Sequence, residues 1–137
     1  MDAISPPNQR HPAVLDLRWT MHVEAREWDA ALKVADDMLA LAPERADSWL
    51  HHAYALRRAS HGGLAQARAA LEPAAKKFPK EPVIPYNLSC YACQLQLLEE
   101  ARAWFQQALK AGKKSELKRM ALADPDLEAL WEEIRPL

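Results

Sequence analysis

The chain has 137 residues, half of them apolar, which is enough to bury the core of one ordinary domain. Its formal net charge of −1 gives no indication of a nucleic-acid partner or of an anionic membrane surface. No apolar run approaches the roughly 20 residues needed to cross a bilayer, the first residues lack the apolar core of a signal peptide, and two cysteines without an export signal indicate reduced thiols in the cytoplasm.

The composition predicts an all-α protein, because alanine and leucine dominate, β-branched residues are few and only 3 glycines are present. Residues 1–11 are polar and proline-rich, so we expect a flexible arm there. From Pro12 onward, apolar residues recur at helical spacing between breaks at proline, glycine or capping residues. The expected helices, in chain order, cover residues 15–24, 28–41, 47 or 48 to 59, 64–78, 85 to a bend at 97–98, 99–111, 115–123 and 125–134.

A unit of two helices recurs three times along this stretch. The units start 34 and then 36 residues apart, at Leu15, Trp49 and Pro85, and the two extra residues fall in the turn sequence SHGG. A proline or lysine closes each unit, and an alanine precedes it by twelve residues. The closing residues are Pro43, Pro79 and Lys113, and the alanines are Ala31, Ala67 and Ala101. Periods of this length predict a helical solenoid.

The units resemble tetratricopeptide repeats, in which large, small and closing residues occupy fixed places. The third unit matches best, with Tyr86, Asn87, Leu88, Ser89, Ala101, Phe105, Ala108 and Leu109. The second offers Trp49, Ala53, Leu56, Ala67, Leu71, Ala74 and Pro79, and the first offers Leu15, Trp28, Ala31, Leu39 and Pro43. Trp19 departs from the pattern, since a small residue is usual there, and Arg18 and His52 stand where leucine is usual.

This resemblance implies a right-handed α-α superhelix of about three hairpins, over residues 12–45, 46–81 and 82–114. Residues 115–137 then form a C-terminal capping segment, which covers the apolar end that such arrays would otherwise expose. The resemblance further implies a non-catalytic module that binds a protein or peptide segment in a concave groove.

The first helix of each hairpin lines that groove in the family. The places carried over to this chain are Asp16, Thr20, Val23, Asp47, Leu50, His51, Tyr54, Arg57, Val83, Tyr86, Asn87, Cys90 and Cys93. Two tyrosines and one arginine on a mostly apolar floor favour an extended or helical peptide with apolar side chains. Of the places that clamp a chaperone's terminal carboxylate in this family, only Asn87 fits, and Asp16 would repel such a group.

Two other functions remain open from the sequence. The groove residues could pack against the protein's own terminus or a second copy of the chain, which would make a self-assembling structural module and a possible homodimer. Alternatively, Cys90 and Cys93 could serve thiol or zinc chemistry, with His51 and His52 as further ligands. The two cysteines lie in the middle of an expected helix, however, and not at the helix start that activates redox thiols. Because the chain also has no catalytic sequence motif, we expect no enzyme activity and no cofactor.

Overall fold

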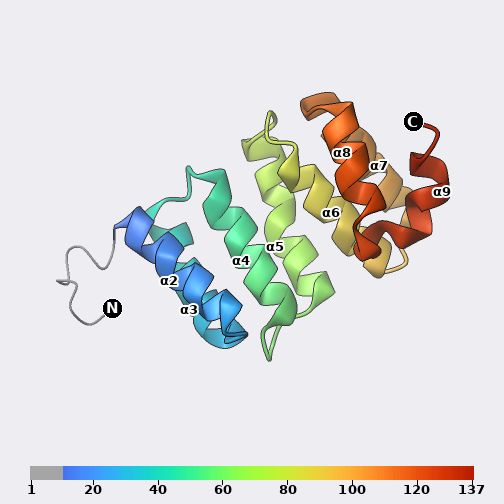
Figure 1. Ribbon diagram of the computed structural model, residues 1–137. Helices are drawn as coiled ribbons and strands as arrows, with labels where there is room; N and C mark the ends of the chain where they lie inside the picture. The colour runs from blue at the N-terminus through green and yellow to red at the C-terminus, as the bar shows by residue number, and fades with distance from the viewer. Residues whose placement is uncertain (1–10) are drawn as a thin grey trace. The chain divides into compact units, whose positions relative to one another are not determined.

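The computed structural model describes residues 11–137, and Figure 1 shows their helices along the chain. These residues are all-α, with eight α-helices and one 3-10 helix. The helices span Pro12–Glu24 (α2), Trp28–Leu41 (α3), Ala46–Arg58 (α4), Leu64–Lys77 (α5), Val83–Gln94 (α6), Leu98–Ala111 (α7), Lys114–Leu122 (α8), Pro125–Leu130 (η1) and Trp131–Ile134 (α9). None of the described helices is long and apolar enough to cross a membrane. The predicted arm lies outside the described residues except for His11, whose imidazole caps α2 by accepting from the Ala13 N–H.

The described residues fall into two compact units, divided after Ala70 within α5. In each unit, helices that follow one another in the sequence pack together: α2 with α3 and α3 with α4 in the first, and α6 with α7 in the second. This sequential packing is consistent with helical hairpins. The division of residues 12–114 into three repeats stays a prediction.

The core of the first unit is built from small residues. Ala31 and Ala35 of α3 and Ala53 of α4 are completely buried, so the backbones of these helices approach closely. Ser48, also completely buried, donates from its hydroxyl to the Ala42 carbonyl at 2.9 Å. Neither Asp47 nor Ser48 caps α4, which begins after Arg45 and thus earlier than the predicted start at residue 47 or 48.

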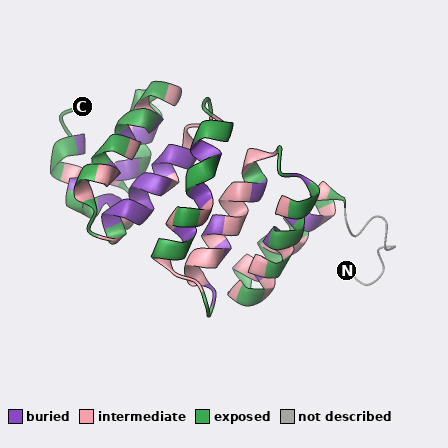
Figure 2. Ribbon diagram, turned by 180° about the vertical axis from the view of Figure 1, so that it is seen from behind, coloured by how far each residue is buried: buried purple, intermediate pink, exposed green. Residues whose placement is uncertain are grey.

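The core of the second unit joins α6 and α7 to the C-terminal segment. Figure 2 shows how deeply α6 is buried, and 9 of its 12 residues belong to the core. One cluster holds the buried side chains of α6, α7, α8, η1 and α9, namely Tyr86, Cys90, Ala92, Cys93, Ala101, Phe105, Ala108, Leu117, Ala121, Leu127, Leu130 and Ile134. The C-terminal segment therefore completes the core of this unit.

The end of the chain differs from its prediction. A single α-helix was expected over residues 125–134, but Pro125–Leu130 is a 3-10 helix and only Trp131–Ile134 is α-helical. Asp124 caps the 3-10 helix by accepting from the Asp126 N–H at 3.0 Å. A 3-10 helix places residues i and i+3 directly in line. Leu127 and Leu130 thus both reach the core, where each is at most 1% exposed.

Two turns 70 residues apart share one geometry. Between α2 and α3, Arg26 takes a left-handed conformation with φ of 58°, and between α6 and α7, Gln96 does so with φ of 67°. In both turns, the next residue donates its N–H to the carbonyl five positions earlier, Glu27 to His22 and Leu97 to Ala92. This is the pattern of a Schellman helix ending. The same local structure recurs at the spacing of two sequence units.

Candidate functional site

Helices α2 and α4 of the first unit lie side by side and run in the same direction. Near the start of both, Arg45 donates from Nη2 to Asp16 Oδ2 at 3.3 Å. Further along, the rings of Trp19 and His51 stack with centroids 3.9 Å apart, and Trp19 meets Tyr54 edge-on at 5.6 Å. These contacts follow the same order along both helices, so the two helices are parallel. We call the surface made by these five side chains and Thr20 the α2–α4 face.

At the far end of the α2–α4 face, the Arg58 side chain makes cation–π contacts with two aromatic rings. The Arg58 guanidinium lies 3.9 Å from the ring centroid of Tyr54 and 5.3 Å from that of Trp28. Arg58 also donates to the Tyr54 carbonyl at 3.0 Å. Contacts of this kind hold Tyr54 in place.

Buried polar atoms without a hydrogen bond gather on α2 and α4. Among the described residues, four side-chain atoms are buried and have no such partner: Asp16 Oδ1, Arg18 Nε, Trp19 Nε1 and His51 Nδ1. Three of these belong to side chains of the α2–α4 face. Burial lowers the pKa of His51 although Asp47 and Asp16 act in the opposite direction, so the imidazole is neutral at pH 7. Native proteins leave few buried polar atoms unpaired, and each such atom calls for a partner that the described residues do not supply, such as a water or a ligand.

The structure brings some of the predicted groove residues of the first unit together. Asp16, His51 and Tyr54 share the α2–α4 face through Trp19 and Arg45. Thr20 is exposed beside them and donates to the Asp16 carbonyl at 2.9 Å. The others keep some access to solvent, with Asp47 exposed and Val23, Leu50 and Arg57 half-buried.

Trp19 and Arg45 are the members of the α2–α4 face that the groove prediction missed. Trp19 did carry a signal, because it is a large residue at a place where the repeat pattern has a small one. In the structure its indole stacks on His51 of α4. Arg45 precedes α4, so the helical spacing that selected the groove residues did not include it.

In the second unit, the predicted groove residues lie beneath the protein's own C-terminal segment. Tyr86, Cys90 and Cys93 are at most 4% exposed and belong to one cluster with Leu127 and Leu130. Val83 and Asn87 are half-buried. On this unit, no open groove runs over Tyr86, Cys90 and Cys93. The role of all five residues as ligand contacts stays a prediction.

Hydrogen bonds join this segment to α6. The Tyr86 hydroxyl donates to Asp124 Oδ2 at 2.9 Å, and Gln94 Nε2 donates to the Asp126 carbonyl at 3.0 Å. Burial and the neighbouring Cys90 and Asp124 raise the pKa of Tyr86 far above its usual value, so the phenol stays protonated and keeps donating. Arg102 of α7 adds an ion pair to Glu133 at 2.6 Å.

The two cysteines are free and buried. Cys90 contributes to the one group of possible metal ligands among the described residues, together with Asp124 and Asp126. The carboxylate of Asp124 is already engaged, because it accepts from Tyr86, from the Cys90 thiol at 3.6 Å and from the Asp126 N–H. Burial raises the pKa of the Cys93 thiol, which disfavours the reactive thiolate.

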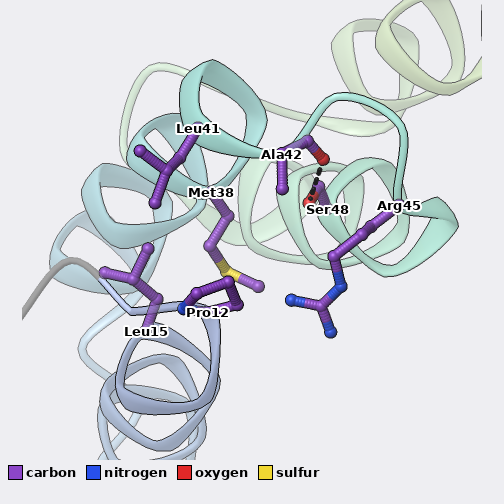
Figure 3. A pocket seen from close by; sticks show the side chains of 7 residues that line it. All are labelled: Pro12, Leu15, Met38, Leu41, Ala42, Arg45 and Ser48. Atoms are coloured by element: carbon purple, nitrogen blue, oxygen red, sulfur yellow. Dashed lines mark hydrogen bonds between the residues drawn. The ribbon is translucent and has the colours of Figure 1, made fainter. Parts of the chain in front are cut away.

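A hollow at the start of the first unit is apolar and shallow. It is lined by Pro12, Leu15, Met38, Leu41, Ala42, Arg45 and Ser48, which Figure 3 shows as sticks. The space has no room for a water molecule. It is therefore a packing feature between α2, α3 and the start of α4, and the α2–α4 face remains the better candidate for binding.

Comparison with known proteins identifies no family. No protein-family model matches the chain, and no curated protein is significantly similar to it in sequence.

Proposed function

We propose that this protein is a tetratricopeptide-like repeat module that binds a short segment of another protein on its α2–α4 face, without catalysing a reaction. The recurring turn at Arg26 and Gln96 and the buried alanines at Ala31, Ala67 and Ala101 support the repeat character. On this proposal, the hairpins continue into the right-handed superhelix expected of the family.

One observation carries the binding function: the second unit already holds a short chain segment on the matching surface of α6. Tyr86, Cys90 and Cys93, which contact that segment, follow Asp16, Thr20 and Val23 by 70 residues, the distance between the two identical turns. The matching place on α2 is less covered, with Asp16 contacting Arg45 at the start of α4. There, Thr20 is exposed while its counterpart Cys90 is buried.

A second candidate function is self-association through the other side of α2. Leu17 and Met21 lie one helical turn apart and are 52% and 47% exposed, which is unusual for large apolar side chains on one stripe. Light scattering of the wild type and of Leu17→Lys distinguishes this candidate. A wild-type dimer that becomes monomeric with Leu17→Lys supports self-association. A wild-type protein that is monomeric at high concentration excludes it.

The binding proposal is tested without knowledge of the natural partner. A phage library of random 12-residue peptides is selected on the full-length chain, and the enriched peptides are made with a fluorescent label. Their affinity is measured for the wild type, for Thr20→Arg on the face, and for Gln107→Arg, an exposed position on α7. Circular dichroism checks the helicity of each variant.

We expect Thr20→Arg to weaken binding at least about 10-fold and Gln107→Arg to leave it unchanged, because a bulky side chain on the face blocks the segment. Peptides that bind all three proteins equally, or a selection that enriches none, would show that the α2–α4 face is not a binding site.

A further inference from the structure

We propose that the segment bound on the α2–α4 face presents a lysine or arginine side chain that donates to the carboxylate of Asp16. This inference rests on the proposed function, and it names the chemistry of the partner. Three features of the face lead to it: an incompletely paired carboxylate, a local excess of negative charge, and the contrast with the occupied surface of α6.

The first feature is the carboxylate of Asp16. Its Oδ2 accepts from Arg45 at 3.3 Å, while its Oδ1 is buried and accepts nothing from the described residues. The side chain as a whole is 36% exposed, and a carboxylate can only accept hydrogen bonds, so a partner that reaches it must be a donor. Ammonium and guanidinium groups make the strongest such bonds to carboxylates.

The second feature is the charge around this oxygen. Arg45 is shared between Asp16 and Asp47, at 3.3 and 3.8 Å, so the three side chains together carry a charge of −1. The neutral His51 adds no positive charge. Arg58 is committed to the rings at the other end of α4, about three turns away from Asp47. Arg18 is two positions from Asp16 on α2 and therefore points to a different side of the helix. A cation from the bound segment neutralises this remaining negative charge.

The third feature is the contrast with α6. At the place that Asp16 occupies on α2, α6 has Tyr86, a donor, and Tyr86 holds an acidic segment through Asp124. Replacing this donor by a carboxylate reverses the polarity of the segment that fits. An acidic segment would meet repulsion from Asp16, and a basic one would meet a partly exposed carboxylate.

The rings beside Asp16 suit the rest of such a side chain. Trp19 and His51 stack at an interplanar angle of 18° and form a flat apolar wall one helical turn from Asp16. The methylene stem of lysine or arginine packs well along an aromatic surface while its charged end reaches a carboxylate.

The test uses the same full-length chain and the peptides enriched from the random library. We expect a lysine or arginine at one constant position among them. Replacing that residue by alanine in the peptide, or Asp16 by asparagine in the protein, should each weaken binding about 10-fold or more, and the two changes together no more than either alone. Asp37→Asn, on the exposed side of α3, is the matched control and should change nothing.

A charge-reversal variant distinguishes a loss of recognition from a loss of folding. Asp16→Lys should lose the basic peptide and gain a peptide in which glutamate replaces the basic residue. Enriched peptides without a basic residue, or losses that add up in the double change, would overturn the inference. If Thr20→Arg still abolishes binding of those peptides, the binding function stands and only the proposed chemistry is wrong. If Thr20→Arg has no effect, both are wrong.

Discussion

Replacing Leu127 by alanine should loosen the C-terminal segment and expose the surface of α6 beneath it. Leu127 is completely buried and shares a cluster with Cys90 and Cys93. Removing three buried carbon atoms from such a leucine costs about 2–5 kcal/mol, because both contacts and packing are lost. The loss falls mainly on closure of this short segment. Since about 1.4 kcal/mol corresponds to a factor of ten, the opening equilibrium should rise roughly 30- to 4,000-fold.

Thiol labelling measures this opening directly. Cys90 and Cys93 are the only cysteines of the chain and both are buried, so the rate of reaction with an aromatic disulfide reagent reports on the α6 surface alone. At one fixed pH, the wild type should react slowly and Leu127→Ala should react faster by the factor given above. Leu17→Ala removes the same atoms from a side chain that is 52% exposed, and it should not change the rate. Wild-type thiols that react as fast as a free thiol, or a folded Leu127→Ala protein with the wild-type rate, would refute the view that this segment covers α6.

Three further substitutions test the packing and electrostatics of the fold. A methyl group on Gly62 would lie 1.8 Å from the Leu56 carbonyl oxygen, so Gly62→Ala should lower the free energy of unfolding by at least about 1–3 kcal/mol, as measured by urea denaturation. The Ser89 hydroxyl donates to a carbonyl of α7 at 2.7 Å in the core, and Ser89→Ala should cost about 1–3 kcal/mol in the same assay, since the buried carbonyl loses that bond. Hydrogen bonds from Ser60 lower the pKa of Asp29, so its carboxylate stabilises the fold above the ordinary aspartate pKa, and this contribution disappears as the pH falls through the lowered value. Asp29→Asn should therefore lower the urea midpoint at pH 7 but leave it nearly unchanged at the acid limit; equal losses at both pH values would contradict this assignment.

Most helices of this protein were predictable because their signals are local. Fully buried alanines such as Ala31 and Ala101 mark where two helices meet, and helical spacing of apolar residues needs no knowledge of distant parts of the chain. The helix predictions failed where tertiary contacts, and not the local sequence, determine the conformation. The segment Pro125–Leu130 has the apolar spacing of an α-helix, yet it winds more tightly as it packs on α6.

The candidate site was only partly predictable, for a similar reason. The structure links Asp16, His51 and Tyr54 through Arg45 and Trp19, while their role as ligand contacts stays a prediction. Register alone could not indicate that Trp19 would stack on His51, because that contact depends on the space between α2 and α4. Nor could it indicate that the C-terminal segment would bury Cys90 and Cys93.

The difference between α2 and α6 is the strongest reason to assign binding to the first unit. Buried small residues support both helices, so the residues on their outer faces are free to differ without changing the fold. On α6 that face is apolar, completed by the chain's own segment and hydrogen-bonded to it. On α2 the matching face keeps a half-paired carboxylate and, with Trp19, an unpaired indole N–H. Departures from the otherwise consistent packing of a protein are expected at functional sites, and on α2 they coincide with the face that we propose for binding.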